Sequence, residues 1–227
     1  MAEERICRET IRYLGYREHR PDPQMEKLIA WGIHETEQKS VPAFIVQEFT
    51  MELGEKHRVR IGDEAFISQN LSRNLQDCEK VLLLAATLGA QVDRLIQKYS
   101  RLDMAKAVIL QAAAAAILEE YCDEKNRELQ QKAEEQGWYF RPRFSPGYGD
   151  FPIDFQKTLL AMLSAQKRIG VTTTESGMLV PVKSVTAVIG MSRRDTKCRL
   201  SGCETCGKRD CIYRRSTSVP LENAKEE

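Results

Sequence analysis

Two short segments of the chain carry side chains suited to binding a ligand or a metal ion. The first is Arg141-Pro142-Arg143-Phe144-Ser145-Pro146-Gly147-Tyr148-Gly149-Asp150-Phe151-Pro152. Prolines fix φ and remove backbone donors, and glycines allow unusual backbone shapes, so this stretch is predicted to be a stiff loop. Arg143 offers a fixed cation and Tyr148 a flat polar ring, which suit a small ligand with a carboxylate and a flat base. Composition alone still favours a plain connector between two helices.

The second segment is a cysteine cluster near the end of the chain. Its spacing is Cys198-x4-Cys203-x2-Cys206-x4-Cys211, with glycines beside the central pair. Such spacing lets four sulfurs converge on one ion, because the glycines allow tight turns. A structural Zn(II) and an iron–sulfur cluster both fit this spacing. Because the segment lacks a ferredoxin-type Cys-x2-Cys-x2-Cys run, the spacing alone does not distinguish the two. The segment is predicted to bind one metal centre.

Length, composition and net charge limit the classes of protein to which the chain can belong. The chain has 227 residues, of which 42% are hydrophobic and 30% charged, which is typical of a globular protein in water. A net charge of +1 gives no broad electrostatic case for binding nucleic acid or membrane, and no apolar run is long enough to cross a bilayer. Since the segment Met1–Arg5 is charged, unlike a signal peptide, the cytoplasm is the expected location. There, cysteines are more often free thiols or metal ligands than disulfides.

Hydrophobic periodicity predicts the elements that must position these segments. Residues 4–19 predict a helix that Pro21 stops, and Asp22 is placed to cap the next one. A short helix is expected to start at Ser68 or Asn70. The other predicted elements in this half are a helix over 23–39, strands over 43–51 and 80–89, and a hairpin that joins strands over 57–61 and 64–68.

The longest predicted helix lies in the middle of the chain. Asp103 is placed to cap it, and it is expected to reach about Gln136 and to end at Gly137. Its first part, Met104–Leu118, is alanine-rich and apolar nearly all round, so burial is expected, whereas the charged part from Glu119 is expected to project into solvent. Further elements are helices over 90–100 and 153–166 and strands over 170–175 and 178–191.

These motifs, taken in order, resemble the activation domain of cobalamin-dependent methionine synthase. Arg143-x-x-Pro-Gly-Tyr148 is followed by Phe151-Pro152, by Gly170-Val-Thr-x-Thr174-Glu175-Ser176, and by Met178-x-x-Pro181-x-x-Ser184-Val185. The likeness is specific over about 138–190. Over 5–135, the runs Arg12-Tyr-Leu-Gly-Tyr16 and Ala85-Ala-Thr-Leu-Gly-Ala-Gln-Val-Asp-Arg94 look like a stand-alone short form of that domain. The chain has no room for the homocysteine, folate or cobalamin modules of the full enzyme.

The resemblance implies an α+β fold with a twisted, mostly antiparallel sheet and long helices. It also implies an S-adenosylmethionine-binding subunit that supports reductive methylation of cob(II)alamin. The cobalamin would be carried by a partner, a methionine synthase or another corrinoid protein, and a flavodoxin-like donor would supply the electron. The chain would then act as a component of a methyltransferase, with no catalytic residue of its own. Two other functions stay open: a non-catalytic docking protein for a corrinoid methyltransferase, and an iron–sulfur electron-transfer protein.

Residue roles and domain limits follow from the same likeness. Arg143 matches the arginine that pairs with the carboxylate of S-adenosylmethionine, and Tyr148 matches a tyrosine that packs near that ligand. The other cofactor-binding residues that the likeness implies are Pro146, Gly147, Gly149, Glu175 and Ser176. The domain is expected over 1–192, the cysteine-rich metal-binding tail over 193–215, and a disordered C-terminus over 216–227.

Overall fold

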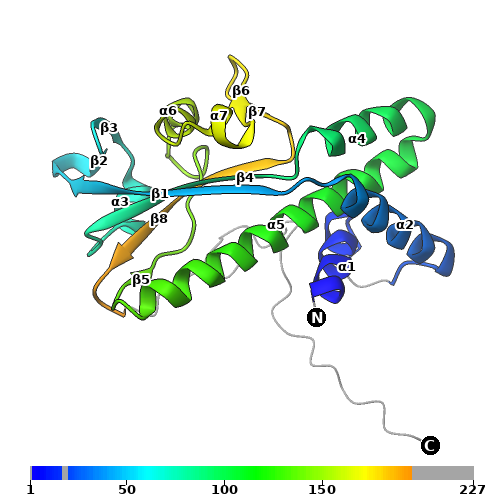
Figure 1. Ribbon diagram of the computed structural model, residues 1–227, viewed down its shortest axis with the longest axis horizontal. Helices are drawn as coiled ribbons and strands as arrows, with labels where there is room; N and C mark the ends of the chain where they lie inside the picture. The colour runs from blue at the N-terminus through cyan, green and yellow to red at the C-terminus, as the bar shows by residue number, and fades with distance from the viewer. Residues whose placement is uncertain (1, 17–19, 196–227) are drawn as a thin grey trace, which may run out of the picture.

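A six-stranded sheet carries the fold in this computed structural model, which describes residues 2–16 and 20–195 (Figure 1). The strand order is β3-β2-β1-β4-β8-β5, and every pairing is antiparallel. The strands are β1 (Ala43–Leu53), β2 (Arg58–Ile61), β3 (Glu64–Ile67), β4 (Lys80–Thr87), β5 (Tyr139–Phe140) and β8 (Ser184–Ser192). With the helices described below, this sheet confirms the predicted α+β class.

Strand β4 is central because both of its faces are covered. Val81 and Leu83 face one hydrophobic cluster, whereas Leu82 and Leu84 face another, and all four are buried. Successive side chains of a strand point to opposite faces, so a strand covered on both sides reads as a continuous apolar run. The strand ends at Thr87, two residues before the predicted limit, because Gly89 turns the chain with a φ of 84°.

One face of the sheet is covered by the long helix α5 (Met104–Glu134), which runs along it in Figure 1. The helices α1 (Ala2–Tyr13), α2 (Pro23–Lys39) and α4 (Ala90–Leu102) are gathered around the start of α5 and pack on it. Asp22 and Asp103 cap α2 and α5 as predicted, since each side chain accepts hydrogen bonds from backbone N–H groups of the first turn. Helix α1 is shorter than predicted, ending at Tyr13.

The burial of residues along α5 differs from the prediction in both halves of the helix. In its first turns, Met104 and Val108 are exposed, although burial was expected along the whole apolar part. In its charged part, Cys122 and Ala133 are buried, so this half lies against the molecule on one side instead of projecting freely into solvent. The charged residues in the second half of α5 therefore lie on its outer face, and Cys122 and Ala133 between them are buried.

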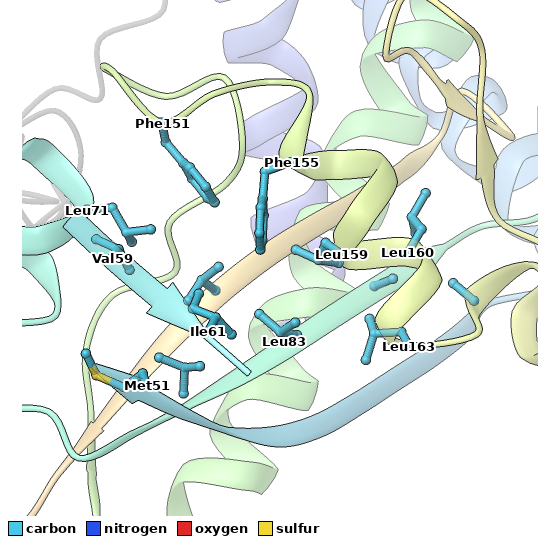
Figure 2. Packing of buried hydrophobic residues seen from close by; sticks show 14 of the residues in the cluster. Met51, Val59, Ile61, Leu71, Leu83, Phe151, Phe155, Leu159, Leu160 and Leu163 are labelled. Carbon is cyan, nitrogen blue, oxygen red and sulfur yellow. The ribbon is translucent and has the colours of Figure 1, made fainter. Parts of the chain in front are cut away.

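The other face of the sheet is covered by shorter elements. They are α3 (Gln69–Asn74), α6 (Phe155–Met162), α7 (Ala165–Ile169) and a small hairpin of β6 (Thr172–Thr173) and β7 (Leu179–Val180), while η1 (Glu55–His57) precedes β2. Figure 2 shows Phe155 and Leu159 of α6 lying over Ile61 and Leu83 of the sheet. This layer holds the loop and the hairpin that the sequence singled out.

Two predicted elements are divided in the structure. The helix over 153–166 breaks at Ser164, whose φ of 51° bends the chain so that Leu163 and Ala165, on either side, are both buried. The strand over 178–191 breaks near Pro181, which has no N–H to donate to a neighbouring strand. Within the described ranges, no helix is long and apolar enough to cross a membrane.

Candidate ligand-binding site

The loop that follows β5 begins as an extended chain beside β8. Arg141 donates its backbone N–H to the Gly190 carbonyl at 2.8 Å, and Phe144 and Val188 exchange backbone hydrogen bonds of 2.9 and 2.8 Å. A tight turn then closes, in which Gly147, with a φ of 89°, donates to the carbonyl oxygen of Phe151 at 2.9 Å. Glycine takes this backbone conformation at little cost. The loop is therefore an ordered turn on the sheet edge.

Asp150 fastens the loop to the start of α3. Its carboxylate accepts hydrogen bonds from Ser68 Oγ at 2.7 Å and from the backbone N–H groups of Gln69 and Asn70 at 2.6 and 3.0 Å. The hydrogen bond from Ser68, together with those from the backbone, lowers the pKa of Asp150 below its ordinary value. A Cβ on Gly149 would lie 2.3 Å from Asn70 Nδ2, so a larger residue here would require the Asn70 side chain of α3 to move.

Phe151 anchors the same loop in the core. Its side chain is 2% exposed, and its ring is stacked on Phe66 at a centroid distance of 5.1 Å. Figure 2 shows Phe151 beside Phe155 above the strands. With a buried ring on one side and the Asp150 carboxylate on the other, the loop has little freedom to move.

Arg143 and Phe144 point to opposite faces of the sheet edge, as neighbours in an extended chain do. Phe144 packs on the cluster under α6. The Arg143 guanidinium reaches α5, where its Nη2 atom lies 2.6 Å from Asp123 Oδ1 and 3.2 Å from Glu119 Oε2. Glu119 and Asp123 are four residues apart and therefore share one face of the helix.

Neither acid was singled out from the sequence. A pair of acids four residues apart, at the point where the apolar half of the predicted helix ends, is the signal that could have found them. The helix face alone did not say which cation they meet, because Arg143 comes from a distant part of the chain.

A hollow of about 220 Å³ opens between α1 and α5 next to this ion-pair cluster. It shares Glu119 and Asp123 with the cluster and adds Glu120, which pairs with Arg5 of α1. The remaining lining residues are Ile6, Arg8, Glu9 and Ala116. Cations and carboxylates thus face the same space, which suits a ligand with both charges.

Tyr148 lies on the side of the sheet edge opposite to the Arg143 guanidinium. Its side chain is 68% exposed, and its ring centroid is 6.3 Å from that of Phe144. Beyond the Phe144–Val188 bridge, the first residues of β8, starting at Ser184, pair with β4 but with no second strand in the described part of the chain. The described part of the chain therefore places no further strand on this edge where Arg143 and Tyr148 leave the loop, and Thr186 of that edge is buried at 1% exposure.

Glu175 and Ser176 lie in the turn of the β6–β7 hairpin, on the α6 side of the sheet. Thr174 Oγ1 and Ser176 Oγ are 2.9 Å apart, and both acid and hydroxyl are exposed. Buried Gln156 ties this turn to the sheet: it donates to the Gly177 carbonyl at 2.5 Å and accepts from Thr186 Oγ1 at 3.1 Å.

The side chain of Ile153 brings the hairpin turn and the loop together. A Cβ on Gly147 would lie 3.2 Å from Ile153 Cδ1, and one on Gly177 would lie 3.3 Å from Ile153 Cγ1. The structure therefore gathers Gly147, Tyr148 and the Glu175 turn on the α6 side, while the Arg143 guanidinium lies on the α5 side. Pro146 is buried within the loop.

The predicted metal ligands Cys198, Cys203, Cys206 and Cys211 lie outside the described residues, as does the tail over 193–215 apart from its first three residues. In the part of the chain that is described, no group of three or more His, Cys, Asp or Glu side chains is arranged to hold a metal ion. Cys122 is buried behind Arg143, and this burial raises the pKa of its thiol to about 12. A thiol in that state is a poor ligand and a poor nucleophile.

The comparison that decides the family covers most of the chain. The family model for the activation domain of vitamin B12-dependent methionine synthase matches residues 34–205. The chain belongs to this family. The match confirms the resemblance stated from the motifs, and it contains the loop, the β6–β7 hairpin, Glu119 and Asp123. Helix α1 precedes the matched region.

A solved structure supports the fold of this activation-domain family member. The crystal structure of the MetH reactivation domain bound to AdoHcy matches with a TM-score of 0.60 and 15% sequence identity, covering 84% of this chain and 76% of that one. At this identity the likeness establishes the shared fold. No curated protein matches the chain.

Proposed function

We propose that this activation-domain family member binds S-adenosylmethionine and presents its methyl group to a cobalamin carried by a partner protein. The observation that carries the proposal is the rigid Arg143-x-x-Pro-Gly-Tyr148 loop at the edge of β8, with acids of α5 beside it. The solved relative was crystallised with AdoHcy, which is S-adenosylmethionine without its methyl group. A member of the same fold thus holds a ligand of this class.

The charges around Arg143 fit the amino-acid end of the ligand. A guanidinium binds a carboxylate through two parallel hydrogen bonds, which lysine cannot do. Glu119 and Asp123, which now pair with Arg143, would receive the ligand's ammonium group. Because the amino-acid end of the ligand brings one ammonium and one carboxylate, besides the sulfonium that carries the methyl group, it can exchange with these ion pairs without leaving a buried charge unpaired.

The α6 side of the edge fits the nucleoside end. The exposed Tyr148 ring offers a flat face for adenine, and backbone groups of Gly147 and Gly149 lie next to it. Glu175 and Ser176 would accept hydrogen bonds from the ribose hydroxyls. The buried Pro146 keeps the turn in one conformation, so ligand binding would not carry the entropic cost of ordering the loop.

The contribution of this chain to the reaction is placement. The partner's corrinoid, reduced by a flavodoxin-like donor, would supply the nucleophile. By holding the ligand in one position, this chain would convert an encounter between two molecules into a local step, which is worth about 7–11 kcal/mol at best. The residues that do this are those that fix the loop, Asp150 and Phe151 above all.

Calorimetric titration of the purified chain with S-adenosylmethionine tests the proposal. We expect saturable heat with one ligand per chain, and competition by S-adenosylhomocysteine. No heat, together with stable binding of the chain to a corrinoid methyltransferase, would instead support the non-catalytic docking function. A visible spectrum of an iron–sulfur cluster without either interaction would support an electron-transfer protein.

A further inference from the structure

Large apolar side chains are exposed beside the proposed ligand site on the α6 side. Tyr148 and Ile153 of the loop are 68% and 43% exposed, and Met178 of the hairpin turn is 59% exposed. Ile153 contacts the backbone at both Gly147 and Gly177, so these apolar residues come from segments that meet. Apolar residues grouped in this way on a surface mark a place where another molecule binds.

A polar hollow of about 380 Å³ opens within this group. Asp154 and Lys157, at the start of α6, lie on one side of it, and Glu175 of the hairpin turn lies on the other. The rest of its lining is Ile153, Thr173, Thr174 and Gly177. None of the three charged groups forms an ion pair within the residues that the structure describes. Two carboxylates against one ammonium leave the hollow negative.

We propose that this surface, made of Tyr148, Ile153 and Met178 around the acidic hollow, docks the corrinoid-carrying partner. A lysine or arginine of the partner pairs with Asp154 on the α6 side of the hollow, which leaves Glu175 on the other side to the ribose of the ligand, and apolar side chains of the partner cover the surrounding residues. Such an arrangement, an apolar contact with charged groups of complementary sign, is typical of specific protein interfaces. The proposal rests on the proposed function.

The geometry of methyl transfer selects this face. In the proposed function the methyl group would pass directly to the corrinoid of the partner, so the partner would lie against the sheet edge at the start of β8, next to Tyr148. On the other side of that edge, Arg143 is occupied by α5 and the surroundings are charged. The apolar residues next to the edge lie on the α6 side, where the turn is pinned to the sheet by Gln156. A partner seated there meets a preformed surface.

The test measures binding of the whole chain to the cobalamin-loaded methionine synthase of the same organism, by biolayer interferometry. We expect Asp154→Lys and Met178→Asp each to weaken binding about tenfold or more, and Lys157→Glu to strengthen it several-fold, because the hollow gains negative charge. Rising salt should weaken the wild type and should reduce the differences between the two charge variants.

Two substitutions serve as matched controls. Val108→Asp introduces the same charge at an apolar position that is 52% exposed on α5, and Arg60→Glu reverses a charge on β2. Both should bind the partner as the wild type does. Circular dichroism of every variant checks that the fold is kept.

Several results would overturn the docking surface. They are absence of binding by the wild type, equal affinity for wild type, Asp154→Lys and Met178→Asp, and weaker binding by Lys157→Glu. Loss of S-adenosylmethionine heat in Asp154→Lys would also overturn it, since the hollow would then belong to the ligand. Partner binding by a chain that gives no heat with S-adenosylmethionine would contradict the proposed function and leave the docking surface standing.

Discussion

Arg143 concentrates the chemistry of the proposed site in one side chain. Its side chain is 21% exposed, and the carboxylates of Glu119 and Asp123 hold its guanidinium group in place. A guanidinium fixed in this way loses little freedom when a ligand carboxylate replaces one of the acids. Cys122 lies behind it as a protonated thiol, so it adds packing and no charge.

Replacing Arg143 should weaken ligand binding strongly. A hydrogen bond to a charged group contributes about 1.5–3 kcal/mol, so Arg143→Ala is expected to lower the affinity for S-adenosylmethionine about 10- to 100-fold. Arg143→Lys keeps the positive charge but not the planar guanidinium, so its affinity for S-adenosylmethionine should lie between those of wild type and Arg143→Ala. Titration calorimetry gives both values, with Arg60→Ala as the control for loss of an arginine. Wild-type affinity in Arg143→Ala would remove this residue from the site.

Asp150 should make stability depend on pH. Its pKa is lowered in the folded chain, so the ionised form stabilises the fold above the ordinary aspartate pKa of about 3.9, and this contribution is lost as the pH falls through the lower, folded value. Asp150→Asn should therefore lower the thermal midpoint by a few degrees at neutral pH, and the difference should shrink in acid.

The neighbouring acid Asp154 provides the control for this experiment, because its side chain makes no capping hydrogen bond. Asp154→Asn should leave the midpoint unchanged at every pH. A difference between wild type and Asp150→Asn that stayed constant as the pH was lowered would show that the carboxylate charge is not what fastens the loop.

Close packing between helices fixes the position of α5, the helix that carries Glu119 and Asp123. Helix α2 approaches α5 where Gly32 faces Ile109, and a Cβ on Gly32 would lie 2.5 Å from Ile109 Cγ2. Small residues along α5 are buried for the same reason. The position of α5 on the sheet, and with it the position of both acids, depends on this close contact.

Enlarging Gly32 should therefore destabilise the protein, although alanine is the better helix former. Overpacking costs about 1–3 kcal/mol, against a gain of about 1 kcal/mol in helix propensity, so the net effect of Gly32→Ala is expected to be destabilising. Chemical denaturation measures it. In the double variant with Ile109→Ala the clash is absent, and the two changes should couple favourably. Stabilisation by Gly32→Ala alone would contradict the contact.

At the scale of the whole molecule, one sheet edge separates two kinds of surface. The α5 side is charged and holds Arg143, whereas the α6 side bears the exposed Tyr148 and Met178. A ligand bound across the edge would contact both, with its amino-acid end among charges and its nucleoside end against the loop. The proposed partner would then cover the ligand from the α6 side.

The cysteine cluster gives a prediction for the complete chain. The protein purified without oxygen should hold one metal centre bound by Cys198, Cys203, Cys206 and Cys211, either zinc or an iron–sulfur cluster. Metal analysis and the visible spectrum distinguish the two. Cys122→Ala, which removes a buried thiol elsewhere, should keep the metal, whereas Cys203→Ala should lose it. A colourless, metal-free preparation with four titratable thiols in this segment would contradict the prediction.

The sequence alone was enough to place the starts of two helices, the buried strand β4 and the family. Capping residues such as Asp22 and Asp103 fixed helix starts because their side chains satisfy local backbone donors, and the run around Leu83 showed that β4 is covered on both faces. The ordered motifs from Arg143 to Val185 pointed to the activation-domain family, which the family model confirms. All of these signals are local in the chain.

Contacts between residues far apart in the sequence could be read only from the folded chain. The tertiary structure paired Arg143 with Glu119 and Asp123, fastened Asp150 to α3, and placed the Glu175 turn on the other side of the sheet edge from the Arg143 guanidinium. The physical reason is that strand pairing fixes which face a side chain points to, and a shift of one residue would reverse it. The motif contains Arg143 and Tyr148 five residues apart, but the pairing of Phe144 with Val188 is what sends them to opposite sides.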